Sequence, residues 1–283
     1  MSTPLRWPAE ALWEAVAPLL PGFTVEVLPS VDSTNTELMR RARAGRAEPI
    51  LLVAEQQTAG RGRLGRAWQS SAGDSLTFSL GLPLAPRDWS GLSLAVGVSV
   101  AESLQPVLPP EGGAVPRVGL KWPNDLWLGG AGGDRKLGGI LVETASFVAP
   151  QGPGPGPNAV PARYVVVGIG LNVRPQPGEG MSLPPGSLQD VEAGLDAPTA
   201  LLRVVPPLVD MLQSFAAYGF APMQPRFALR DVLQGRSVQL SDGTSGMAHG
   251  VGEDGALLVH TAGGMLPVTS SDISVRPVPA TTP

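Results

Sequence analysis

The pattern of apolar residues changes once along the chain, near residue 234. Before that point, helix-spaced and strand-like segments alternate, as in a domain that packs helices on a sheet. After it, short alternating segments are separated by Asp-Gly and Gly-Gly turns, which is typical of a small β-barrel or β-sheet module. The sequence therefore predicts two units, residues 1–233 and 234–283.

Hydrophobic spacing and turn residues also predict the individual elements. Helices are expected over residues 9–20, 34–44, 92–104, 199–218 and 224–233. Strands are expected over residues 23–28, 50–54, 75–80, 118–121, 126–128, 137–144, 164–173, 237–240, 247–251, 256–260 and 265–268. Thr34 and Glu37 have the spacing of a capping box, and Pro206-Pro207 is expected to break its helix. The Gly/Pro run 149–161 is expected to be disordered.

Composition excludes several classes of function. A net charge of −4 excludes a generally basic nucleic-acid-binding protein. The absence of cysteine excludes disulfides, thiol nucleophiles and thiolate metal sites. The two histidines, His249 and His260, lie near the end of the sequence, which argues against a histidine-based metal centre in the larger unit. No apolar run approaches the ~20 residues of a membrane span, so we expect a cytoplasmic protein without membrane binding.

A glycine-punctuated segment, Gly60-Arg-Gly-Arg-Leu-Gly-Arg66, is the strongest site candidate. Arg61 and Arg63 are two residues apart, so an extended chain points them to one side, and guanidinium groups fit phosphate or carboxylate oxygens in pairs. The flanking glycines let backbone N–H groups approach an anion. The segment predicts a loop over a phosphorylated or carboxylated ligand, and a solvated surface loop is the alternative.

Neutral hydrogen-bonding side chains precede this loop. Ser33-Thr-Asn35 stands at the predicted start of a helix, and Gln57 adds an amide. Such groups suit a ligand with urea-like or amide-like polarity. Taken alone, the Ser33–Asn35 triplet is better explained by ordinary capping of the helix.

Only two of the 20 basic residues are lysine, Lys121 and Lys136. Lys121 opens Lys121-Trp-Pro-Asn-Asp125, whose Asn124 and Asp125 would project from the end of a loop, although an Asn-Asp turn is common. Lys136 enters an apolar strand, where an ammonium group needs an anion unless its stem reaches solvent from an edge. Because lysine is so scarce in this chain, its presence at these two positions indicates that a compact ammonium charge is needed there.

Nucleotide-binding signatures of two common kinds are missing from the sequence. Gly168-Ile-Gly-Leu-Asn172 lacks the spacing of a dinucleotide-binding loop, and no G-x-x-x-x-G-K-[ST] segment occurs. Any ATP would therefore be held by the arginine loop and the sheet.

Taken together, these segments resemble the biotin–protein ligase family. The matching segments, in chain order, are Asp32–Asn35, Gln57 with Gly60–Trp68, Lys121–Leu126, Arg135–Glu143 and Gly168–Asn172. The resemblance implies an α+β fold like that of class II aminoacyl-tRNA synthetases, a mixed sheet with flanking helices, followed by a small SH3-like β-barrel. It also implies two reactions: biotin and Mg²⁺·ATP give biotinyl-5′-AMP, and the biotinyl group then passes to a lysine of a carboxylase's biotin carrier domain.

The resemblance also implies roles for individual residues. The expected catalytic residues are Lys136, Arg63 and Asp125. Biotin contacts are expected from Ser33, Thr34, Asn35, Gln57, Arg61, Gly62, Arg63, Lys136 and Gly168. Contacts to ATP or the adenylate are expected from Arg61, Arg63, Arg66, Trp68, Lys136 and Asn172. No protein-bound metal is expected, because Mg²⁺ would arrive with ATP.

Partners and rival functions follow from the same resemblance. Some members carry an N-terminal DNA-binding domain, for which too few residues precede Ser33, so we expect the monofunctional type without specific DNA binding. The resemblance allows a homodimer. The nearest rival is a lipoate or octanoate ligase or transferase of the same fold, against which the polar groups at Ser33–Asn35 and Gln57 argue. A non-catalytic polyanion-binding module would need more basic charge and aromatic residues.

Overall fold

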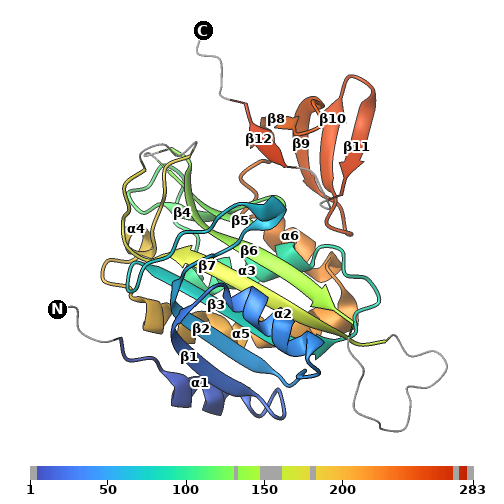
Figure 1. The fold of residues 1–283 in the computed structure, drawn as a ribbon. Helices are drawn as coiled ribbons and strands as arrows, with labels where there is room; N and C mark the ends of the chain where they lie inside the picture. Colours follow the sequence, from blue (N-terminus) through green and yellow to red (C-terminus); the bar gives the residue numbers. More distant parts are fainter. Residues whose placement is uncertain (1–4, 131–132, 147–160, 179–182, 270–273, 279–283) are drawn as a thin grey trace.

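The computed structural model describes residues 5–130, 133–146, 161–178, 183–269 and 274–278 (Figure 1). Its larger sheet has seven strands in the order β1-β2-β3-β7-β6-β5-β4. These strands are β1 (Thr24–Val31), β2 (Ile50–Gln57), β3 (Ser75–Leu84), β4 (Arg117–Lys121), β5 (Asp125–Gly129), β6 (Arg135–Ala145) and β7 (Arg163–Asn172). β1 and β2 are parallel and the other neighbours antiparallel, which confirms the expected mixed sheet. Residues 149–160 of the predicted disordered run lie outside the described residues.

Helices cover both faces of this sheet. They are α1 (Ala9–Val16), α2 (Thr34–Arg43), α3 (Leu92–Leu104), α4 (Leu188–Val191), α5 (Ala197–Tyr218) and α6 (Gln224–Ala228). Figure 1 shows α2 in front of the sheet and α3 and α5 behind it. Alternate residues of the strands supply the two faces: Leu51 and Val53 of β2 join the large core with α3 and α5, whereas Leu52 joins a smaller core under α2.

The helix α5 differs from the prediction because it continues through Pro206-Pro207. Proline removes the N–H that would bond the carbonyl four residues earlier. Pro207 and Leu202 are exposed and Pro206 is half-buried, so water can reach that side of the helix. α5 is also long and apolar enough to pass a length test for a membrane span, but half of that stretch is buried and its buried side chains belong to the large core.

Further boundaries differ from the predictions, among them the end of α1, which lies at Val16 rather than at residue 20. Ser33, rather than Thr34, caps α2, because the Ser33 hydroxyl accepts a hydrogen bond from the Thr36 N–H at 3.4 Å. The helix expected over residues 224–233 ends at Ala228. The chain then runs beside β4, where Leu120 donates its N–H to the Arg230 carbonyl at 2.7 Å and accepts from the Val232 N–H at 3.1 Å. This pairing covers an edge strand that would otherwise expose its backbone.

The C-terminal strands form a second, five-stranded antiparallel sheet in the order β11-β10-β9-β8-β12. They are β8 (Ser237–Leu240), β9 (Ser245–Val251), β10 (Leu257–Thr261), β11 (Gly264–Val268) and β12 (Val275–Pro277), the last of which was not predicted. Within the described residues this sheet stays open, with β11 and β12 as its edges, rather than closing into the expected barrel. It contacts the larger unit where the indole N–H of buried Trp122 donates to the Gly255 carbonyl at 3.0 Å.

Candidate functional site

A cavity lies where the start of α2, the arginine loop, the turn between β4 and β5, and the middle of β6 and β7 meet. It brings together residues that are far apart in the sequence. Of the residues predicted to form the site, those that line it are Ser33, Thr34, Asn35, Gln57, Arg61, Gly62, Arg63, Arg66, Trp68, Asp125, Lys136 and Gly168. Asn172 is the exception: it is buried beside the cavity, and its amide donates to the carbonyls of Lys136 and Gly186.

Neutral hydrogen-bonding groups form one end of the cavity. Thr34 donates its backbone N–H and its hydroxyl to Gln57 Oε1 at 2.8 and 3.1 Å. Asn35 donates to the Leu141 carbonyl and to Glu143 Oε2, and its Oδ1 lies 2.6 Å from the Ser79 hydroxyl. The side chains of Thr34 and Asn35 are thus fixed before any ligand enters. Their positions suit a compact ligand with both donors and acceptors.

Two glycines of β7 form the floor of the cavity. A Cβ at Gly168 would collide with the Asn35 amide, and one at Gly170 would lie 2.5 Å from the Trp68 ring. Only glycine therefore allows Asn35 and Trp68 to lie against the strand. The indole N–H of Trp68 is buried without a hydrogen-bond partner among the described residues.

The arginine loop folds as a tight hairpin beside this floor. The Gly62 N–H donates to the Arg66 carbonyl at 2.7 Å, and the Trp68 N–H donates to the Gly60 carbonyl at 2.8 Å. Leu64 turns the chain with φ of +56°, in the left-handed region. The Arg61 guanidinium lies 3.5 Å from Glu143, the same carboxylate that accepts from Asn35. Glu143 therefore joins the loop to the polar end of the cavity.

The opposite end carries two lysines and one aspartate. A bulge in β6 at Leu137 turns Lys136 toward Asp125, and the Lys136 ammonium lies 2.8 Å from Asp125 Oδ1. The buried Lys121 ammonium lies 3.9 Å from Asp125 Oδ2. Burial lowers the pKa of Lys121 to about 8, and the charges of Lys136, Arg66 and Arg63 add to this, whereas Asp125 opposes it.

The cavity is more positive than the chain as a whole. Arg61, Arg63, Arg66, Lys121 and Lys136 line it, with Asp125 as the acid among the lining residues that the structure describes. The net charge of the chain is −4. Local cationic charge beside a neutral polar pocket suits a ligand with an anionic end, such as a carboxylate that meets a phosphate. In the described part of the chain, no group of three or more His, Asp or Glu side chains is arranged to hold a metal ion.

Sequence reasoning missed several members of the site, including Gly170 of the cavity floor. Ser79 and Glu143 hold Asn35 and Arg61, and Lys121 was noticed for its rarity but not included among the site residues. A serine among apolar residues of the strand at 75–80 was the available signal for Ser79. Glu143 gave no comparable signal, because an acid near the end of a strand is common on surfaces.

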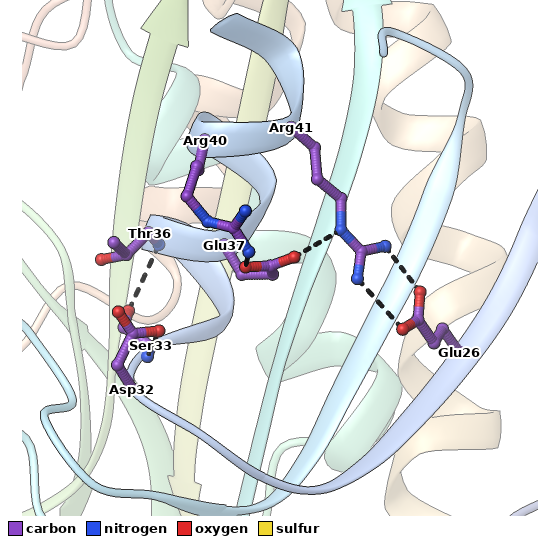
Figure 2. A network of polar contacts seen from close by, with 7 residues as sticks. All are labelled: Glu26, Asp32, Ser33, Thr36, Glu37, Arg40 and Arg41. Atoms are coloured by element: carbon purple, nitrogen blue, oxygen red, sulfur yellow. Dashed lines mark hydrogen bonds and ion pairs between the residues drawn. The ribbon is translucent and has the colours of Figure 1, made fainter. Parts of the chain in front are cut away.

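An ion network holds α2, which carries the polar end of the cavity. Figure 2 shows the Arg41 guanidinium between Glu26 of β1 and Glu37 of α2. Arg41 bonds both oxygens of Glu26, at 2.6 and 3.0 Å, and donates from Nε to Glu37 at 2.6 Å. Glu37 also accepts from Arg40. The hydrogen bond from Arg41 lowers the pKa of Glu26; burial raises the pKa of Glu37, but the bonds from Arg41 and Arg40 outweigh it and lower that pKa too.

Comparisons with known proteins show similarity to one family. The Biotin/lipoate A/B protein ligase family matches residues 27–151, and the Biotin protein ligase C terminal domain matches residues 235–276. The chain is 34% identical to the bifunctional ligase/repressor BirA of Escherichia coli, over 91% of this chain and 75% of that protein. It is 30% identical to a biotin–[acetyl-CoA-carboxylase] ligase of Paracoccus denitrificans, over 87% of this chain and 98% of that protein.

A solved structure shows the same similarity. The biotin protein ligase from Aquifex aeolicus in complex with biotin and ATP superposes with a TM-score of 0.70 and 27% identity, over 90% of this chain and 99% of that one. The expected fold and the resemblance are both confirmed, apart from the closed barrel. Sequence and fold together place the chain in the biotin/lipoate A/B protein ligase family, as a biotin protein ligase.

Proposed function

We propose that this ligase uses the cavity to join biotin to AMP and then transfers the biotinyl group to a lysine of a biotin carrier domain. The observation that carries the proposal is the polarity of the cavity. A fixed set of neutral groups at Thr34, Asn35 and Gln57 lies at one end and Lys136 lies at the other, while the cations of the arginine loop line the same cavity. Biotin has the matching form, with a ureido ring at one end and a carboxylate at the other.

In the first reaction, an oxygen of the biotin carboxylate attacks the α-phosphorus of ATP. A bond forms between carboxylate oxygen and phosphorus, and the bond to the pyrophosphate oxygen breaks. Both reactants are anions, so the approach needs positive charge that is already in place. Arg63 and Lys136 supply it in this proposal, with Arg61 and Arg66 beside them.

The nucleotide is proposed to lie against the loop. Trp68 offers a ring face for adenine, and the exposed Arg66 lines the same cavity. Mg²⁺ is proposed to arrive bound to the phosphates, and Asp125 is the acid that lines the cavity among the described residues. The role of Asn172 is proposed to be indirect, because its amide holds the backbone of Lys136 at 3.1 Å.

In the second reaction, the acceptor lysine attacks the acyl carbon of biotinyl-AMP. A C–N bond forms, the acyl–phosphate bond breaks, AMP leaves and one proton is released. Asp125 is proposed to orient the incoming amine, since a carboxylate beside the reaction centre attracts an ammonium group and accepts its hydrogen bonds. Asn124 supports this turn by donating from its side chain to the Ile140 carbonyl at 2.8 Å.

Lipoate is the substrate to distinguish, because the matching family includes lipoate ligases. A lipoyl ring cannot hydrogen-bond as a ureido ring does, so Asn35 and Gln57 would find no hydrogen-bonding group on that ligand. The decisive experiment measures exchange of labelled pyrophosphate into ATP. Exchange that depends on biotin and not on lipoate supports the proposal, and exchange with neither acid contradicts it.

Two variants test the assigned roles in the same assay. Lys136→Ala is expected to abolish exchange while biotin still binds, because the ureido end is unchanged. Arg63→Ala is expected to weaken retention of biotinyl-AMP more than binding of biotin. Equal losses of biotin affinity in both variants, measured by calorimetry, would contradict this division of roles. The acceptor is proposed to be a carboxylase's carrier domain in the cytoplasm.

A further inference from the structure

The Asp125 carboxylate forms ion pairs with two lysine ammonium groups in this structure. Its Oδ1 lies 2.8 Å from Lys136 Nζ, and its Oδ2 lies 3.9 Å from Lys121 Nζ. The two lysines differ in exposure: 36% of the Lys136 side chain is exposed, against 10% for Lys121. Both lysines line the cavity, but Lys136 has more freedom to follow a ligand than the more deeply buried Lys121.

Contacts on several sides hold Lys121 in place. It is the last residue of β4 and is paired in register with Asp125 of β5. Its ammonium donates to the Trp122 carbonyl at 3.4 Å and lies 5.6 Å from the centre of the Trp127 ring. A lysine held in this way is suited to fixing a neighbour and poorly suited to following a substrate.

In the proposed function Asp125 loses one of its two ammonium partners when the ligand binds, and Lys121 is the one that remains. When Lys136 turns to the carboxylate of biotin or the phosphate of the adenylate, it leaves Asp125 Oδ1. The Asp125 side chain is only 17% exposed, so a carboxylate that lost both ammonium partners there would be poorly hydrated and would move. Lys121 remains on the other oxygen.

We propose that Lys121 is a positioning residue that keeps the Asp125 carboxylate in place while Lys136 is engaged with the ligand. This inference rests on the proposed function. It assigns Lys121 to the transfer of biotin to the acceptor lysine, the step in which Asp125 acts, and not to the formation of the adenylate. The alternative is that Lys121 binds the phosphates directly, which would place its effect in the first step.

The test measures the two steps separately in the full-length chain. Pyrophosphate exchange reports adenylate formation, and single-turnover transfer from added biotinyl-AMP to a carrier domain reports the second step. Lys121→Met is expected to slow transfer by roughly 10- to 100-fold and to leave the KM for ATP in exchange unchanged. Arg117→Met, which removes a cation from the same strand, is the matched control and is expected to alter neither step.

The pH profile and a double variant add readouts that misfolding would not produce. Lys121 has a pKa of about 8 and faces Asp125, Lys136, Arg66 and Arg63, so its charge is lost as pH rises through that value. Lys121→Arg stays charged, and the ratio of wild-type to Lys121→Arg transfer rates is expected to fall between pH 7 and 9. With Asp125→Asn already present, Lys121→Met is expected to have no further effect on transfer.

Three results would overturn the inference. They are a raised KM for ATP with unchanged transfer in Lys121→Met, a constant ratio of rates across pH, or full additivity of the two substitutions. A wild-type chain without biotin-dependent exchange would instead overturn the proposed function. The failures of the two proposals are therefore distinguishable.

Discussion

Among single residues, Gly168 most directly limits the shape of the cavity. The Cβ of Gly168→Ala would push the Asn35 amide away from β7. We expect biotin affinity to fall roughly 5- to 150-fold, which corresponds to about 1–3 kcal/mol for a forced repacking. Calorimetric titration with biotin measures this loss.

A matched glycine supplies the control for that substitution. Gly129 ends β5, and no described heavy atom lies within 4 Å of the position of an added Cβ. Gly129→Ala is expected to bind biotin as the wild type does. Unchanged affinity in Gly168→Ala would show that Asn35 does not need its observed position.

The carboxyl group of Asp231 is expected to make the stability of the chain depend on pH. Burial raises the pKa of Asp231 to about 6, although the N–H groups of Leu233 and Gln234 oppose the shift. The folded chain thus holds a proton that the unfolded chain releases near pH 4, so stability falls from about pH 4 to 6 and the penalty then stays constant. Asp231→Asn lacks this slope, and we expect its stability relative to wild type to rise by about 2 kcal/mol between pH 4 and 7.

Denaturant unfolding at the two pH values checks this prediction. Asp88→Asn is the control variant, because the Asp88 carboxylate accepts from the Ser90 N–H in an exposed turn of similar geometry. A pH-independent difference between Asp231→Asn and the wild type would contradict the assignment of a raised pKa.

At the scale of elements, the ion network decides how firmly α2 is held to β1. The pKa values of Glu26 and Glu37 are both lowered in the folded chain. The two carboxylates therefore stabilise the fold fully above about pH 4.5, and this stabilisation is lost as pH falls through their pKa values in the folded chain. Glu26→Gln is expected to destabilise the chain by about 1 kcal/mol at pH 7, a modest figure because the side chain is partly exposed. The difference from wild type should shrink at pH 3.

Thermal unfolding at pH 7 and pH 3 measures that change, with Glu14→Gln on the exposed side of α1 as the control. Because α2 also carries Thr34 and Asn35, the variant should release biotin faster as well. A destabilisation that is the same at both pH values would mean that the network does not act through charge.

At the scale of the whole molecule, Trp122 joins the smaller sheet to the turn between β4 and β5 that lines the cavity. Its indole N–H bonds the buried Gly255 carbonyl, while the next residue, Pro123, lines the cavity. Trp122→Phe leaves that carbonyl without its donor, and we expect a loss of about 1–3 kcal/mol. Scanning calorimetry measures this loss, and Trp13→Phe, at a half-exposed position, is the control. Equal stability of both variants would exclude a role for the contact.

The sequence by itself determined most of the elements and the chemistry of the site segments. Local spacing predicted the helix over residues 92–104 and the central strand, because periodicity and stop signals depend only on neighbouring residues. The motifs from Ser33, Arg61, Lys121 and Lys136 predicted the kind of ligand, because the residue types themselves carry the charge and hydrogen-bonding capacity.

Only the tertiary structure decided how those groups meet. The bulge at Leu137 turns Lys136 toward Asp125, and the packing of α2 on β7 sets Asn35 over Gly168. Ser79 and Glu143 join the site through contacts between distant segments, which no local pattern encodes. The chain after Ala228 leaves the helix because β4 offers unpaired backbone groups at its edge. Pairings of this kind depend on which surfaces are left to be covered, and the packed chain alone fixes that.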